Sequence, residues 1–188
     1  MNKESLFNTL RELAKTLTQT QVDSVNAILD SCIKHGIIDK RYIAYILATC
    51  YHESGLKPIE EIGKGKGLPY GSKLDIGKGA GKRVAYSKPD KLYYGRGFVQ
   101  ITWLSNYKAF SKLLKLDLVN RPELALQIDI AAEIIVLGML KGMFTGVKLA
   151  DAFNDNESDA IEAREIVNGH DKAALIKGYY DKIYNSIK

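Results

Sequence analysis

A glutamate near the end of a predicted helix is the first candidate catalytic residue. Glu53 follows Cys50 by three residues and Ile46 by seven, so its side chain projects from the apolar face of that helix. It also lies in the last turn, where the helix dipole opposes a negative charge. Because partial burial and the dipole both favour the protonated carboxyl, Glu53 is a candidate general acid. The alternative is a glutamate that only reaches solvent at a frayed helix end.

A second carboxylate follows within eight residues. Glu60 and Glu61 lie on the segment that leaves the helix, where one of them could face Glu53 across a groove. Two carboxylates flanking a cleft, one as acid and one activating water, are the minimal equipment for glycoside hydrolysis. Since Ile59 and Ile62 flank the pair, both glutamates cannot point at the cleft. The spacing alone does not choose between them.

The segment 93–103, YYGRGFVQITW, combines glycines, aromatic rings and polar side chains. Its two glycines allow a ligand to approach the backbone closely. Tyr94 and Trp103 offer faces on which sugar rings could stack. Gln100 and Thr102 alternate with apolar neighbours, so both would face one side if this stretch is extended. The alternative is a buried turn from strand to helix, with Trp103 in the core.

Apolar residues at helical spacing predict a mainly α domain that positions these residues. Asp39 caps the helix that carries Glu53, and Gly55 ends it. Thr18 or Thr20 caps the helix before it. The length of 188 residues fits a single domain, 1–188. The predicted helices span 3–17, 18–36, 39–55, 100–115, 122–141 (opened by Pro122), 146–154, 157–168 and 171–187.

Residues 62–92 interrupt the helical pattern with seven glycines and two prolines. We expect an irregular lobe here, with short strands near 73–76 and 84–86, lining the substrate groove. Residues 63–91 hold eight basic and two acidic residues, whereas the rest of the chain is slightly acidic. This concentration of positive charge predicts an anionic partner.

Several classes of protein are disfavoured by composition and motifs. Hydrophobic residues make up 46% and charged residues 26%, which is globular, and no apolar run suits a membrane span or a signal peptide. Cys32 and Cys50 predict buried reduced thiols, not a disulfide framework. We expect no metal and no cofactor, because Leu56 replaces the second histidine of an HExxH motif and no phosphate-loop pattern fits. Few aromatic residues accompany the basic segment, which disfavours a nucleic-acid binder.

Three motifs in order resemble a known enzyme family. HESG at 52–55, YYGRGFVQITW at 93–103 and IVNG at 166–169 are similar to the chitinases of glycoside hydrolase family 19. The similarity is closest to bacteriophage endolysins of that lysozyme-like superfamily. The resemblance implies a lysozyme-like helical catalytic domain. It also implies hydrolysis of the β-1,4 bond between N-acetylmuramic acid and N-acetylglucosamine in peptidoglycan, with inversion and without a cofactor.

The resemblance also assigns roles to residues at the matching positions. It makes Glu53 the general acid, and Glu61 the second carboxylate with Glu60 as the runner-up. Thr102 would help to hold the attacking water. For inversion we expect the two carboxyl groups to lie about 6.5–9.5 Å apart. The substrate-binding residues expected from the resemblance and from the 93–103 segment are Tyr94, Gln100, Asn106, Arg164 and Asn168.

The sequence departs from the family chitinases in ways that favour the endolysin pattern. Phe98 replaces a proline, His170 replaces a second glycine, and the cysteine-rich loop that carries their second carboxylate is absent. A chitinase, a lytic transglycosylase and a non-catalytic wall-binding module remain the alternatives.

The expected setting follows from the same resemblance. We expect a monomer that is made in the host bacterial cytoplasm without a signal peptide and acts in the periplasm at lysis. Its partners would be peptidoglycan and, through residues 63–91, the anionic outer-membrane surface.

Overall fold

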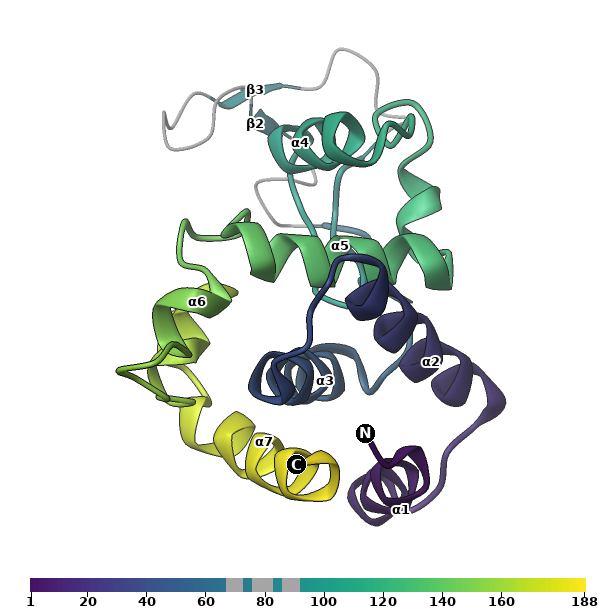
Figure 1. Cartoon of the computed structure of the whole chain (residues 1–188). Coiled ribbons are helices and arrows are strands. Elements are labelled where there is room, and N and C mark those ends of the chain that lie inside the picture. The colour runs from purple at the N-terminus through teal and green to yellow at the C-terminus, as the bar shows by residue number, and fades with distance from the viewer. Residues whose placement is uncertain (67–72, 76–82, 86–91) are drawn as a thin grey trace.

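The computed structural model describes residues 1–66, 73–75, 83–85 and 92–188, and most of these residues are helical (Figure 1). None of the helices in those ranges is both long and apolar enough to cross a membrane. The α-helices are α1 (Lys3–Ala14), α2 (Gln19–Lys34), α3 (Lys40–Ser54), α4 (Leu104–Leu114), α5 (Ile128–Lys141), α6 (Leu149–Ala152) and α7 (Ala173–Ile187). Two 3₁₀ helices are η2 (Pro122–Leu126) and η3 (Glu162–Ile166), and the strands are β1 (Ile59–Glu60), β2 (Lys73–Asp75), β3 (Arg83–Ala85) and β4 (Arg96–Gly97).

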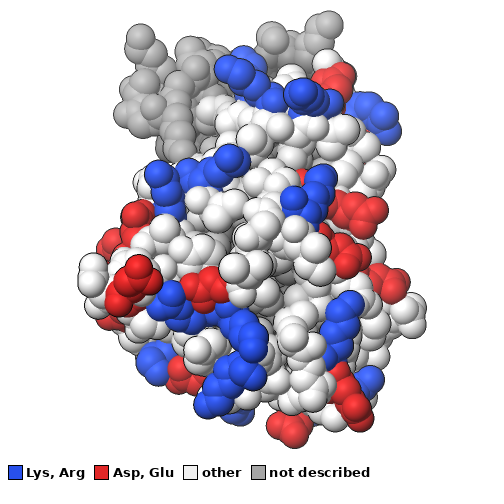
Figure 2. Space-filling model, viewed as in Figure 1, with Lys and Arg blue, Asp and Glu red and all other residues white. Residues whose placement is uncertain are grey.

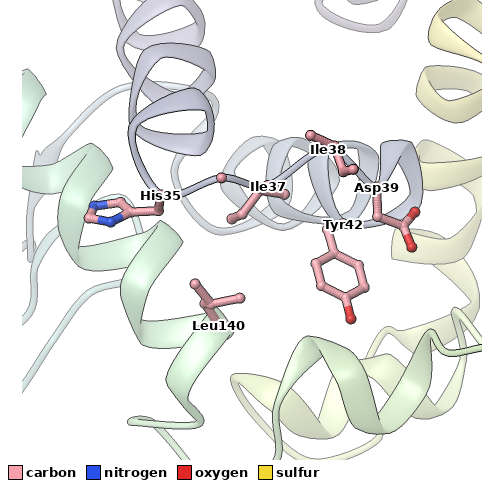
Figure 3. Close-up of a pocket in the computed structure, with 7 residues that line it drawn as sticks. His35, Ile37, Ile38, Asp39, Tyr42 and Leu140 are labelled. Atoms are coloured by element: carbon pink, nitrogen blue, oxygen red, sulfur yellow. The ribbon is translucent and has the colours of Figure 1, made fainter.

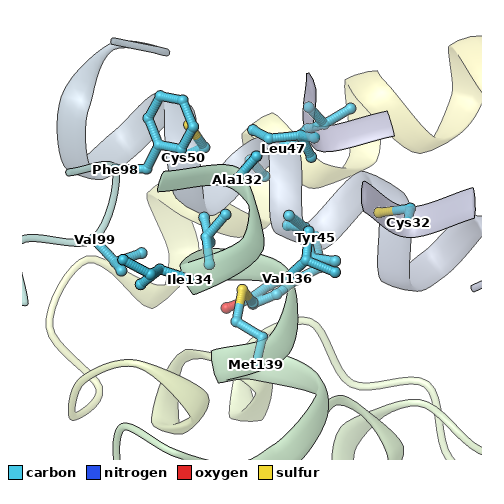
Figure 4. Packing of buried hydrophobic residues seen from close by; sticks show 14 of the residues in the cluster. Cys32, Tyr45, Leu47, Cys50, Phe98, Val99, Ala132, Ile134, Val136 and Met139 are labelled. Atoms are coloured by element: carbon cyan, nitrogen blue, oxygen red, sulfur yellow. The ribbon is translucent and has the colours of Figure 1, made fainter. Parts of the chain in front are cut away.

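Helix α3, which carries Glu53, is the centre of the helical core. It packs against α7, α2 and α5, while α1 packs against α7 (Figure 1). Figure 4 shows side chains of α3, α5 and residues 98–99 in one buried cluster. Complete burial of an aliphatic side chain stabilises a fold by about 1.5–3 kcal/mol. The support of α3 on several sides therefore gives Glu53 a rigid base.

Local capping signals set the bounds of α2 and α3 close to where the sequence predicted. Thr18 caps α2, and its side chain accepts a hydrogen bond from the backbone of Gln21. The Asp39 side chain accepts from the Arg41 backbone and begins α3, and Gly55 ends α3 in the left-handed conformation, at φ 61°. The mainly α prediction is confirmed.

The predicted helix over 122–141 is in fact divided. Pro122 opens the 3₁₀ helix η2, and Gln127 is extended, with φ −71° and ψ 132°, before α5 begins. The break follows from tertiary packing, since η2 lies against β4. A Cβ atom at Gly97 would lie 2.9 Å from the Ala125 carbonyl oxygen, so the approach of η2 to β4 requires a glycine there. The predicted helix over 157–168 is likewise only the short η3.

Within the described ranges, two antiparallel strand pairs accompany the helices. β2 and β3 pair in the lobe, close to the positions that the sequence predicted. β1 and β4 pair with Glu60 opposite Arg96, which the sequence analysis missed because each strand has only two residues. The other parts of 67–91 lie outside the described residues, so the groove lining and the basic surface expected there stay predictions.

Both cysteines are free and buried, as predicted. Burial raises the pKa of the Cys32 thiol to about 12 and also raises the pKa of Cys50. Both thiols are therefore protonated and unreactive at neutral pH.

Candidate functional site

Glu53, at the end of α3, is held by an arginine that lies 111 residues further along the chain. Arg164 Nη1 donates to Glu53 Oε1 at 2.7 Å, and its Nε donates to the Asp171 carbonyl at 2.9 Å. The Arg164 side chain is 3% exposed and that of Glu53 is 21% exposed. A charge-assisted bond of this length fixes the carboxylate in one place. The sequence argument for Glu53 considered burial and the helix dipole, and it left this ion pair out.

Glu61 is held at the other end of a short connecting segment, by the backbone of Gly95. The Glu61 N–H donates to the Gly95 carbonyl, and the Gly95 N–H donates to Glu61 Oε2, both at 2.9 Å. A Cβ atom at position 95 would lie 2.7 Å from Gln100 Oε1 and 3.2 Å from Glu61 Oε2. Because Gly95 has no side chain, the Glu61 carboxylate and the Gln100 amide can both lie close to its backbone.

Glu60 has a different set of partners. The Tyr94 hydroxyl donates to Glu60 Oε1, Lys64 Nζ lies 3.3 Å from Oε2, and Arg96 Nε lies 3.9 Å from Oε1. The hydrogen bond from Tyr94, helped by the two cations, lowers the pKa of Glu60. The contacts of Glu60 thus stabilise the β1–β4 pair, whereas the Glu61 carboxylate lies beside Gly95 and Gln100. This arrangement favours Glu61 over Glu60 as the second carboxylate.

Tyr94 does not offer the open ring face that the sequence analysis expected. It is 6% exposed, and the Arg96 guanidinium carbon lies 3.7 Å from its ring centroid. Arg96 is itself buried and donates to the Tyr107 hydroxyl at 2.9 Å. Tyr94 and Arg96 therefore pack against each other and hold Glu60 in place. Sequence analysis missed Arg96, although an arginine between two glycines of the motif was a usable signal.

Gln100 lies near Glu61, but its backbone is not extended. Residues 98–100 form a turn, and Gln100 has φ 51°. Its Nε2 donates to the Ile59 carbonyl at 2.8 Å and to the Gly97 carbonyl at 3.0 Å. The predicted alternation of Gln100 and Thr102 along a strand is therefore wrong. Gln100 instead bridges β1 and β4 and lies beside Gly95.

Thr102 and Asn106 occupy the entry to α4. The Asn106 side chain donates to the Thr102 carbonyl at 2.9 Å, and its backbone N–H donates to the Trp103 carbonyl at 3.1 Å. Thr102, Trp103 and Asn106 are all half-buried. Asn106 thus stabilises the first turn of the helix, and Trp103 is neither fully in the core nor fully exposed.

Asn168 is exposed on the turn that follows Arg164. Its backbone N–H donates to the Arg164 carbonyl at 3.1 Å, and its side chain accepts from the Gly169 N–H at 2.9 Å. An open hollow of about 370 Å³ adjoins it, lined by Thr145, Val147, Glu165, Val167, Asn168 and Gly169. The hollow therefore lies next to the turn whose first residue, Arg164, binds Glu53.

Two clusters therefore contain most of the predicted site residues. One joins Glu53, Arg164 and Asn168, and the other joins Glu61, Gly95 and Gln100. Residues 54–60 connect them directly. The expected separation of about 6.5–9.5 Å between the Glu53 and Glu61 carboxyls stays a prediction.

One group of side chains in the described ranges could ligate an ion. Possible ligand atoms of Glu162, Glu165 and His170 lie within 4.8 Å of one another. His170 Nε2 lies 2.8 Å from Glu165 Oε1, so these two side chains already form a pair. This cluster does not test the expectation that the protein binds no metal, which stays a prediction.

A separate pocket lies at the opposite end of α3. It has a volume of about 210 Å³ and lies between the end of α2, the start of α3 and α5 (Figure 3). Its lining includes Asp39, fourteen residues before Glu53, which is about 21 Å along a helix. This pocket is therefore not part of the Glu53 site.

The described surface carries charges of both signs. Figure 2 shows acidic and basic side chains interspersed on the face viewed, with no large area of a single charge.

Part of the chain is similar in sequence to known chitinases. No protein-family model matches the chain. Over 90 residues, or 47% of this chain, the sequence is 39% identical to one endochitinase of Arabidopsis thaliana and 37% identical to another. The alignment covers 28% of each relative, so the chain spans less than a third of the curated proteins it matches.

The fold is shared over nearly the whole chain. A bacterial family 19 chitinase superposes with a TM-score of 0.51 and 18% identity, covering 95% of this chain and 92% of that one. The chain is therefore similar to endochitinases over 90 residues, and its mainly helical fold is like that of the bacterial family 19 chitinase.

Proposed function

We propose that the chain is a glycoside hydrolase that cleaves the β-1,4 bond between N-acetylmuramic acid and N-acetylglucosamine in peptidoglycan, as a bacteriophage endolysin does. The observation that carries the proposal is the separate anchoring of two carboxylates: Glu53 by Arg164 and Glu61 by Gly95. Both anchors are directional hydrogen bonds, so each carboxylate is pre-positioned before a substrate binds. Pre-positioned groups of this kind supply much of the rate enhancement in hydrolysis.

The two carboxylates have different roles in the proposed reaction. Glu53 protonates the departing glycosidic oxygen, and since Arg164 occupies Oε1, we assign the proton to Oε2. Glu61 removes a proton from water, and Thr102 helps to hold that water on the opposite face of the sugar. The water oxygen bonds to the anomeric carbon as the glycosidic bond breaks, which inverts the configuration.

A chitinase of the same family is the second candidate. The named relatives over the 90 matched residues are endochitinases, and the protein with the similar fold is a chitinase. The basic segment 63–91 favours peptidoglycan, because this polymer is anionic and chitin is neutral. Digestion of purified peptidoglycan beside colloidal chitin separates the two candidates.

Mass spectrometry of the released fragments tests the reaction itself. We expect reducing-end N-acetylmuramic acid from peptidoglycan. Reducing-end N-acetylglucosamine would instead define a glucosaminidase, and an anhydro end a lytic transglycosylase. Bacterial lysis that survives Glu53→Gln would indicate a non-catalytic wall-binding module.

The same proposal includes the setting in which the enzyme acts. The protein would be a monomer that waits in the bacterial cytoplasm and reaches the peptidoglycan of the periplasm at lysis. Residues 63–91 would add attraction to the anionic outer-membrane surface, without a role for nucleic acid.

A further inference from the structure

Gln21, in the first turn of α2, is a buried polar residue with contacts to two helices. It is 8% exposed. Its Oε1 accepts from the Thr18 backbone N–H at 2.9 Å and from the Thr18 hydroxyl at 3.1 Å. Its Nε2 donates to the Gly55 carbonyl at 2.8 Å. One amide therefore links the start of α2 to the end of α3.

The acceptor, Gly55, lies in the turn that follows Glu53. Its N–H donates to the Tyr51 carbonyl at 3.0 Å, and the next residue, Leu56, donates to the Cys50 carbonyl at 3.4 Å. These bonds close the end of α3 and leave the Gly55 carbonyl outside the helix, where Gln21 meets it. From this turn the chain runs directly to Glu61.

The identity of the residue at position 21 reflects both contacts. A capping box requires only an acceptor oxygen, which glutamate supplies as well as glutamine. The bond to Gly55 requires a donor on the same side chain, which glutamate lacks when ionised. Capping of α2 therefore does not explain the amide, whereas the contact with α3 does.

We propose that Gln21 is a positioning residue that fixes the turn between Glu53 and Glu61. The proposal rests on the proposed hydrolase function, because it concerns the placement of these two carboxylates. Loss of the amide donor frees the Gly55 carbonyl and lets the last turn of α3 shift. A displacement of about 1 Å in a reacting group lowers a rate by as much as about 100-fold.

Two variants separate this role from simple stabilisation. Gln21→Glu keeps the acceptor for Thr18 and removes the donor to Gly55. Thr18→Ala removes the capping hydroxyl and leaves the Gln21–Gly55 bond in place. We expect Gln21→Glu to lower kcat by about 10-fold with KM within about twofold. We expect Thr18→Ala to lower Tm by about 3 °C with kcat unchanged.

A second readout does not depend on activity. Hydrogen exchange at the Gly55 and Leu56 amides should become faster in Gln21→Glu and stay as in the wild type in Thr18→Ala. If Gln21→Glu does not fold, Gln21→Met, which loses both contacts, is compared with Thr18→Ala, which removes only the capping hydroxyl. Gln21→Glu with wild-type kcat and wild-type exchange would overturn the proposal. So would a loss of kcat in both variants that follows their loss of Tm.

Failure of the proposed function gives a different result. In that case Glu53→Gln would leave wild-type activity unchanged, or the wild type would hydrolyse no glycan. The exchange rates at Gly55 and Leu56 would still report whether Gln21 fixes the turn.

Discussion

Arg164 binds Glu53 across 111 residues of chain, with 2.7 Å between Nη1 and Oε1. The same guanidinium binds the Asp171 carbonyl through Nε, so the arginine is held at two points. Its side chain is 3% exposed and that of Glu53 is 21% exposed, so water reaches the pair only from the glutamate side. The position of Glu53 is thus set jointly by the end of α3 and by η3, which carries Arg164.

Replacement of Arg164 by lysine should therefore impair catalysis. Lysine keeps the charge, but a single ammonium cannot reproduce the two-point contact of the guanidinium. We expect Arg164→Lys to lower kcat about 10- to 100-fold and the free energy of unfolding by about 1–3 kcal/mol. Enzyme kinetics and urea unfolding measure the two effects.

Arg121→Lys is the matched control for this prediction. Arg121 pairs with Glu123 at 3.5 Å, but the two side chains are 62% and 61% exposed. Exposed pairs contribute little, so this variant should match the wild type. Equal kinetics for Arg164→Lys and Arg121→Lys would show that the two-point contact is unimportant.

Substitution of the adjacent glutamates should give unequal results. Glu61→Gln should lower kcat by at least about 100-fold, because it removes the base that activates water. Glu60→Gln should retain most of kcat, since Glu60 is paired with Tyr94 and Lys64 and is not the proposed base. Rates of peptidoglycan hydrolysis for the two purified variants test this order, and the reverse order would make Glu60 the second carboxylate.

The lowered pKa of Glu60 should make the free energy of unfolding depend on pH. The hydrogen bond from Tyr94 lowers the pKa of Glu60 below its ordinary value of 4.5. A carboxyl with a lower pKa in the folded state adds stability above pH 4.5, which is lost as the pH falls through the folded value. The stability difference between wild type and Glu60→Gln should therefore shrink from about pH 6 to about pH 3 in urea unfolding. A constant difference would contradict this assignment.

A methyl group at position 95 should disturb the site. The Cβ atom of Gly95→Ala would lie 2.7 Å from Gln100 Oε1 and 3.2 Å from Glu61 Oε2. We expect a loss of kcat of about 10-fold or more, because the Gln100 side chain must move away and Glu61 Oε2 must shift slightly with it. Gly178→Ala in α7 is the control, since nothing lies within 4 Å of its Cβ position. That change should raise the free energy of unfolding by about 0.5–1 kcal/mol and leave kcat unchanged.

The sequence by itself determined the bounds of α2 and α3 and the candidate residues. Thr18, Asp39 and Gly55 mark helix ends through contacts with residues close in the chain, so their types predict the boundaries. Periodic apolar residues likewise predicted that α3 is a core helix with Glu53 at its end. These features depend on local geometry, which a sequence pattern records directly.

Only the tertiary structure decided how the candidate residues are paired. The partners of Glu53, Glu60 and Glu61 all come from distant segments: Arg164 for the first, Tyr94 for the second and Gly95 for the third. The division of the predicted 122–141 helix also depends on a contact between η2 and β4. Such contacts arise when segments far apart in the chain pack together, and no spacing within either segment encodes them.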